Sequence, residues 1–235
     1  MNHADAAAKA HLWQVLFSFF YLLIFPVVLF LLAGDWYWTE GWIFSIDFCV
    51  LSYAIVIYLY VEDPALLNER FGSPVQKSQK PWDKIFLILF FIGFLAWYAI
   101  MPLDARRFRW SPEFPLWLEI LGILLFILAF IILFGALKEN TFAAPVVKMQ
   151  KERGQRVIST GLYGIVRHPM YSGGSLLFIG GPLLLGSIYG LVIGLLLTVM
   201  IAVRSLGEEE MLKRELDGYN EYMKKVKWRL VPFVF

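Results

Sequence analysis

The chain has 235 residues, of which 59% are hydrophobic and only 17% are charged, and its formal net charge is +2. A soluble domain of this length cannot bury so large an apolar fraction in one core, and a chain with 21 Phe, 11 Tyr and 9 Trp is not disordered. A single cysteine excludes a disulfide scaffold, and the near-neutral charge argues against nucleic-acid binding. The composition therefore predicts an integral membrane protein.

Apolar runs long enough to cross a bilayer follow one another along the chain. A spanning helix needs roughly 20 mostly apolar residues, and residues 12–33, 42–61, 85–102 and 115–137 meet this condition. A last apolar block, 171–203, is too long for one span and is interrupted between Pro182 and Ser187. We expect it to form a short fifth helix of about 15 residues and a sixth over residues 188–206, paired as a helical hairpin. The predicted fold class is an all-α integral membrane protein with about six transmembrane helices.

The basic residues are distributed unevenly between the two sides of such a bundle. Eighteen of the 21 Lys and Arg fall in the tails and loops that share a side with the termini. The other three, Arg106, Arg107 and Arg109, lie in one loop of the opposite side. Because cytoplasmic loops carry the excess of Lys and Arg, both termini are predicted to be cytoplasmic.

Polar residues are concentrated late in the chain, in 138–170 and 204–235. We therefore divide it into an N-terminal four-helix membrane region, 1–137, and a C-terminal region, 138–235, that carries the site. The two are expected to form one integrated domain.

The segment Gly161–Tyr171 lies where the chain re-enters the membrane. His168 precedes a proline, which pushes its backbone away from helical geometry. Polar and aromatic side chains surround this kink: Tyr163, Arg167, His168 and Tyr171. The alternative interpretation is an ordinary interfacial helix start, with Pro169 in the first turn and Tyr and Arg as headgroup anchors.

The sixth predicted helix ends with a charged pair. Arg204 and Glu208 are four residues apart on one helix face, and a charge at the membrane margin is costly unless it is paired or functional. The alternative is an ordinary ion pair between them, with Glu209 and Glu210 in solvent. From Glu208 the apolar spacing predicts one continuous amphipathic helix on the cytoplasmic membrane surface, with its apolar face at Leu212, Leu216, Tyr219, Met223 and Val226.

Taken in order, these motifs carry a family resemblance. Gly161-x-Tyr163, Arg167-His168-Pro169-x-Tyr171, an apolar hairpin, Arg204-x-x-x-Glu208-Glu209, Tyr219-x-x-Tyr222 and Pro232 occur in sequence. This arrangement resembles the isoprenylcysteine carboxyl methyltransferase family, within the wider group of phospholipid methyltransferase-like membrane enzymes. It covers residues 140–232. The resemblance implies an S-adenosylmethionine-dependent methyltransferase that acts on a lipophilic acceptor at the cytoplasmic membrane face.

The resemblance also implies roles for individual residues. Glu208 would hold the amino group of S-adenosylmethionine, and Arg204, the catalytic residue, would orient the carboxylate of the acceptor. The remaining cofactor-binding residues would be Gln150, Gln155, Arg156, Val157, Ile158, Tyr163, His168, Pro169, Met170 and Tyr171. No metal is expected.

The possible acceptor groups differ in their protonation state at pH 7. A carboxylate is already ionised at pH 7 and needs no general base, so a lipid-borne or lipidated carboxylate is favoured. A phospholipid amine or a small thiol is the alternative, and it would need a proton acceptor such as His168 or Glu209. An NADPH-dependent enzyme like the sterol reductases and a non-catalytic membrane protein are further alternatives, and the oligomeric state is left open.

Overall fold

The structure is a computed structural model, and it describes residues 12–73, 76 and 79–235. Six long helices form the body: α1 (Leu12–Ala33), α2 (Thr39–Glu62), α4 (Pro81–Pro102), α5 (Leu116–Glu139), α6 (Pro169–Leu185) and α7 (Ile188–Glu215). Two short helices, α3 (Pro64–Arg70) and α8 (Tyr219–Lys225), lie at one end. Within these residues the only β-type pairing is an isolated bridge between Val166 and Trp228. The predicted all-α class is confirmed.

The helices that were expected to cross the membrane are present. Five of them are long and apolar enough to span a bilayer, and α6, with 17 residues, is shorter. The division of the last apolar block is confirmed, because the break between α6 and α7 falls inside the expected interval. α6 continues through Pro182 to Leu185, and Gly186 follows it with a φ of 78° that suits glycine. Ser187 then caps α7 by accepting a hydrogen bond from the Gly190 N–H at 2.9 Å.

The third predicted span is longer than its apolar run. The chain continues past Pro102 as a π-helix over Leu103–Phe108. Asp104 is buried there and accepts hydrogen bonds from the hydroxyls of Ser111, at 2.7 Å, and Ser187, at 2.6 Å. This carboxylate ties the α6–α7 turn to the end of α4, because a buried acid needs such partners.

Glycines allow the central helices to meet at backbone contact. A Cβ on Gly180 would lie 2.7 Å from the backbone nitrogen of Phe126, and one on Gly194 would lie 2.1 Å from the carbonyl oxygen of Phe178. Small residues are used in this way where helices pack inside a membrane. The core between the helices is largely aromatic, and its buried members include Phe30, Trp97, Met101, Phe126, Phe178 and Leu184.

The C-terminal segment does not form the expected continuous surface helix. α7 ends at Glu215, the chain turns at Gly218 with a φ of 81°, and α8 begins at Tyr219. Its apolar side chains pack against Val147 and Val157 of the preceding loop rather than standing free for a lipid surface. The prediction was wrong because helical spacing of apolar residues continues across the turn, although the backbone does not.

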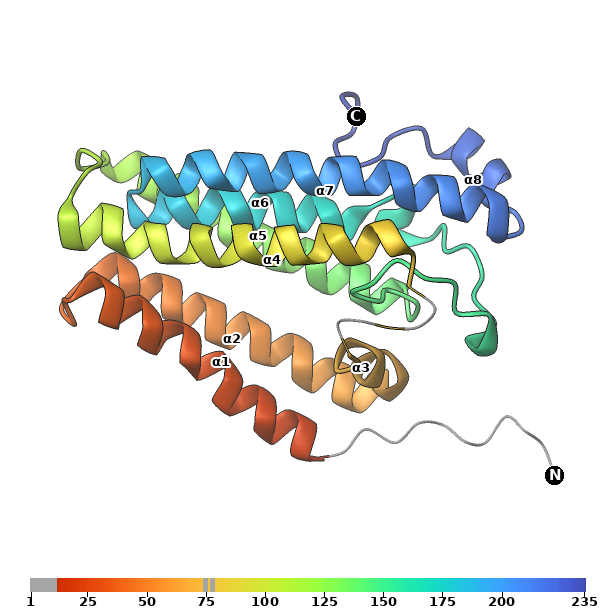
Figure 1. Ribbon diagram of the computed structural model, residues 1–235, viewed down its shortest axis with the longest axis horizontal. Helices are drawn as coiled ribbons and strands as arrows, with labels where there is room; N and C mark the ends of the chain where they lie inside the picture. The colour runs from red at the N-terminus through yellow and green to blue at the C-terminus, as the bar shows by residue number, and fades with distance from the viewer. Residues whose placement is uncertain (1–11, 74–75, 77–78) are drawn as a thin grey trace.

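Figure 1 shows that the segments 63–73, 140–168 and 216–235 lie at one end of the bundle. The turns at 34–38 and 186–187 and the connection 103–115 lie at the other end. This arrangement brings the late motifs together at one end of the bundle.

Candidate active site

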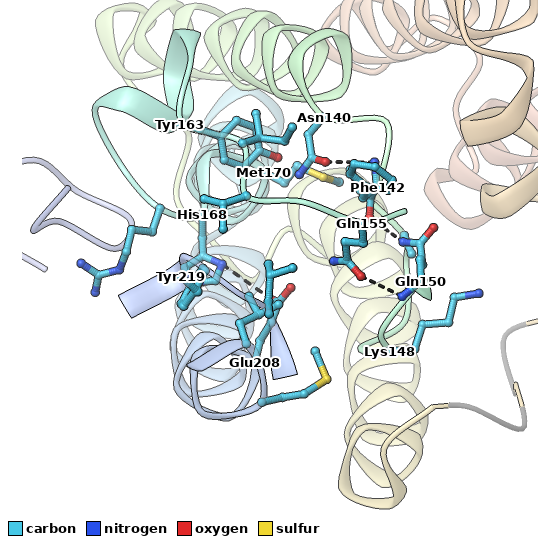
Figure 2. A pocket seen from close by; sticks show the side chains of 18 of the residues that line it. Asn140, Phe142, Lys148, Gln150, Gln155, Tyr163, His168, Met170, Glu208 and Tyr219 are labelled. Atoms are coloured by element: carbon cyan, nitrogen blue, oxygen red, sulfur yellow. Dashed lines mark hydrogen bonds and ion pairs between the residues drawn. The ribbon is translucent and has the colours of Figure 1, made fainter. Parts of the chain in front are cut away.

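One cavity at this end, with a volume of about 170 Å³, brings the motif residues together. Eleven of the twelve expected site residues line it: Gln150, Gln155, Arg156, Val157, Ile158, Tyr163, His168, Met170, Tyr171, Arg204 and Glu208. Figure 2 shows several of them around the opening. Pro169 is not among the lining residues, and it is instead the buried first residue of α6, where its missing N–H costs nothing. The roles of all twelve remain predictions.

The kink before α6 is held by the end of the chain. His168 has φ −127° and ψ 63°, outside the helical region as expected before a proline. The backbone N–H groups of Arg167 and His168 donate to the carbonyls of Trp228 and Arg229, each at 2.9 Å. The C-terminal segment therefore supplies the acceptors that a helix would otherwise have provided.

Glu208 presents a carboxylate to the cavity. The Tyr171 hydroxyl donates to its Oε2 at 2.6 Å, and Nδ1 of His168 lies 3.7 Å from the same oxygen. The His168 and Tyr171 rings stack, with centroids 5.3 Å apart. In the part of the chain that the structure describes, no lysine or arginine forms an ion pair with Glu208. Its negative charge is thus free to bind a cation.

Glu209 has a different environment from its neighbour. It is 1% exposed and pairs with Arg167 Nε at 2.7 Å and Arg229 Nε at 3.0 Å, while His168 Nε2 lies 3.2 Å away. The interpretation that places Glu209 in solvent is therefore wrong, whereas Glu210 does lie on the surface, paired with Arg214. Glu209 lies on α7, so its ion pairs with Arg167 and Arg229 hold the kink and the C-terminal segment against this helix.

Arg204 is bound to a partner that the sequence analysis missed. Its Nε donates to Asp83 Oδ1 at 2.8 Å and its Nη2 donates to the Pro145 carbonyl at 2.9 Å. The guanidinium also lies over the rings of Phe86, at 5.2 Å, and Tyr171, at 5.8 Å. These contacts hold the arginine in the wall of the cavity.

Asp83 is 0% exposed and also accepts hydrogen bonds from Gln79 and from the backbone N–H of Val147. An ion pair between Arg204 and Glu208, the alternative for this helix end, is therefore not formed. The only sequence signal for Asp83 is an acid in the first turn of a helix, which is common and points to no particular partner.

The loop after α5 forms much of the cavity wall. Gln150 is buried, its Nε2 donates to the Phe142 carbonyl at 2.8 Å, and its Oε1 accepts from Arg153 at 2.5 Å. Its backbone N–H donates to Gln155 Oε1 at 2.7 Å. The side-chain amide of Gln150 is thus engaged at both ends in shaping the loop.

Other residues of the wall had no site role in the sequence analysis, although Arg167, Tyr219 and Tyr222 belong to its motifs. They are Arg70, Asn140, Phe142, Ala143, Ala144, Pro145, Val146, Lys148, Arg167, Met211, Leu212, Leu216, Tyr219 and Tyr222. Arg70, on α3, donates to the Ala143 carbonyl at 3.2 Å, and Lys148 pairs with Glu69 of the same helix at 2.8 Å. The N-terminal region therefore supports the loop of the site. In the sequence, Arg70 and Lys148 could be recognised only as charged residues between predicted membrane helices.

Buried tyrosines complete the wall. Burial is the main reason that the pKa values of Tyr163 and Tyr222 are raised, so both hydroxyls keep their protons at neutral pH. The Tyr222 hydroxyl donates to the backbone carbonyl of Tyr163 at 2.7 Å. This bond fixes α8 against the segment that precedes the kink.

Comparison with known proteins agrees with this geometry. Residues 117–217 match the phospholipid methyltransferase family, which confirms the resemblance to integral membrane methyltransferases that was recognised from the late motifs. The protein is accordingly a multi-pass integral membrane protein whose residues 117–217 are similar to this family.

Among solved structures, a similar one is that of the eukaryotic intramembrane Ras methyltransferase ICMT (isoprenylcysteine carboxyl methyltransferase). The TM-score is 0.48 and the sequence identity 19%, over 95% of this chain and 86% of that chain. No curated protein matches the sequence.

Proposed function

We propose that the protein transfers a methyl group from S-adenosylmethionine to a lipophilic acceptor, with a carboxylate favoured, at the cytoplasmic face of a membrane. One observation carries the proposal: a single cavity gathers eleven residues from the separate segments 150–158, 163–171 and 204–208. The family match over residues 117–217 supports the same chemistry.

The lining of the cavity fits this cofactor. When bound, S-adenosylmethionine supplies a methyl group on a cationic sulfonium, together with an ammonium, a carboxylate and an adenosine. Glu208 carries a carboxylate that no described lysine or arginine pairs with, which suits an ammonium. Tyr171 lines the cavity, where its ring lies against the His168 ring and the Arg204 guanidinium. The segment 155–158 with Met170 offers polar and apolar surface for the adenosine.

Arg204 is placed to orient a carboxylate acceptor. Asp83 and Pro145 occupy Nε and Nη2, and no described residue binds Nη1. The arginine therefore keeps donors for an anion while its position is fixed. A carboxylate needs no proton transfer to attack, so positioning and exclusion of water are what this site contributes.

An amine acceptor is a second candidate, because two observations favour it. Asp83 already compensates the charge of Arg204, which weakens the attraction of this arginine for a carboxylate. His168 lines the cavity, and its Nε2 lies 3.2 Å from Glu209. This pair can accept the proton that an ammonium must lose before the neutral amine attacks the methyl group.

Acceptor and cofactor reach the site by different routes. The acceptor arrives from the bilayer, since its tail would lose roughly 0.8 kcal/mol per methylene on entering water. The charged cofactor arrives from the aqueous side. The cavity of about 170 Å³ is smaller than the roughly 300–1,000 Å³ typical of ligand sites, so we expect α8 to move outward when the cofactor enters.

Cofactor binding to the detergent-purified full chain tests the proposal. We expect calorimetry to show binding of S-adenosylmethionine and none of NADPH. Binding of NADPH alone would instead support a reductase, and binding of neither would support a non-catalytic role. Transfer of labelled methyl groups to a prenylated carboxylate, to phosphatidylethanolamine and to a small thiol then identifies the acceptor.

A further inference from the structure

The hydroxyl of Tyr219 is a buried donor without a partner. The side chain is 4% exposed, it lines the cavity, and no described residue hydrogen-bonds its oxygen. The other tyrosine hydroxyls of this wall have partners: Tyr222 donates to a carbonyl, Tyr171 donates to Glu208, and the Tyr163 side chain hydrogen-bonds Asn140. A buried polar group without a partner is costly and calls for an explanation.

The position of Tyr219 restricts which ligand group it can meet. It is the first residue of α8, directly after the turn at Gly218, and its ring packs against Tyr222 with centroids 5.6 Å apart. Figure 2 shows it beside His168 and Glu208. Burial, and after it the negative charges of Glu209 and Glu208, raise the pKa of Tyr219, so its hydroxyl stays protonated and remains a donor.

The neighbouring arginines on this side have other roles. Arg167 binds Glu209 and the carbonyls of Val226 and Lys227. Arg204 uses Nε and Nη2 for Asp83 and the Pro145 carbonyl, and its Nη1 is the donor proposed above for the acceptor. In an α-amino acid the carboxylate is attached to the carbon that carries the ammonium. A cofactor whose ammonium is held by Glu208 therefore brings an anionic acceptor close to Tyr219, and hydrogen bonds to anions are the stronger ones.

We propose that Tyr219 is a cofactor-binding residue whose hydroxyl donates to the α-carboxylate of S-adenosylmethionine. This inference rests on the proposed function and adds a ligand contact that the late motifs do not assign. Because Tyr219 belongs to α8, the same bond couples the carboxylate to the position of α8 over the cavity. Cofactor binding and the closure of α8 over the cavity are then coupled.

The test compares Tyr219→Phe with wild type in the full-length, detergent-purified protein. The probes are S-adenosylmethionine and its decarboxylated analogue, which keeps the ammonium and the sulfonium. Calorimetry should show an affinity loss of about 10- to 100-fold for the first and under about 2-fold for the second. Without ligand, the melting temperature should stay the same or rise, since the hydroxyl has no partner to lose.

Two control variants separate this contact from other causes. Tyr222→Phe loses a buried hydrogen bond, so it should melt earlier without ligand and weaken both probes equally. Arg156→Gln removes the exposed cation of the cavity wall and should not act selectively on the carboxylate.

The inference fails if Tyr219→Phe weakens both probes equally or leaves the affinity for S-adenosylmethionine unchanged. It also fails if Arg156→Gln shows the carboxylate-selective loss instead. If the wild type binds neither probe, the proposed function is refuted and this inference with it.

Discussion

Replacement of Arg204 by alanine should lower the stability of the fold, in addition to any effect on methyl transfer. The guanidinium compensates Asp83, which is 0% exposed and would remain buried with only Gln79 and the Val147 N–H as partners. Removing one member of a buried ion pair costs about 3–5 kcal/mol, because the other charge stays in the interior without compensation. For a chain of this size that corresponds to a melting temperature lowered by roughly 6–20 °C.

A double-mutant cycle measures the interaction free energy between Arg204 and Asp83. We expect Arg204→Ala and Asp83→Ala each to lower stability, and the double variant to be more stable than the sum of both losses by about 2 kcal/mol. Thermal unfolding in detergent, followed by circular dichroism without ligand, measures all four proteins. Arg204→Lys keeps the charge, so it should retain most of the stability while losing the planar donor geometry.

The cycle also decides how activity data are interpreted. If Arg204→Lys folds like wild type, binds S-adenosylmethionine normally and loses methyl transfer, Arg204 orients the acceptor. If the free energy of unfolding of Arg204→Ala is within about 1 kcal/mol of wild type and the cycle is additive, the pair of Arg204 and Asp83 does not stabilise the fold.

Three further outcomes are expected. Glu208→Gln should weaken binding of S-adenosylmethionine by roughly 10- to 150-fold in calorimetry, with an unchanged melting temperature, since one charge-assisted bond is lost; equal affinity would place the ammonium elsewhere. In a Cys49→Ser background, Thr39→Cys should react with an impermeant thiol reagent only from the non-cytoplasmic side and Lys224→Cys only from the cytoplasm, and the reverse pattern would overturn the topology. Gly194→Ala should lower the melting temperature strongly, because its Cβ would lie 2.1 Å from a backbone oxygen of α6; an unchanged melting temperature would contradict the close packing.

Local features of the sequence determined the number and approximate limits of the long helices. The runs 12–33 and 115–137 agree closely with α1 and α5, since a bilayer-length apolar run has few structures open to it. The family resemblance carried by the motifs around His168 and Glu208 grouped residues that line one cavity in the structure, and their roles in a site stay predictions.

Only the tertiary structure decided which partners these residues have. Asp83 and Arg204 are 121 positions apart in the sequence and yet form an ion pair. Arg70 lines the same cavity although it belongs to the other half of the chain. Glu208 and Glu209 are adjacent and identical in type, yet one faces the cavity and the other is buried among cations. Apolar spacing could not locate the turn at Gly218. A side chain's partner depends on which helices pack together, and that is settled by contacts between segments far apart in the chain, which no local pattern records.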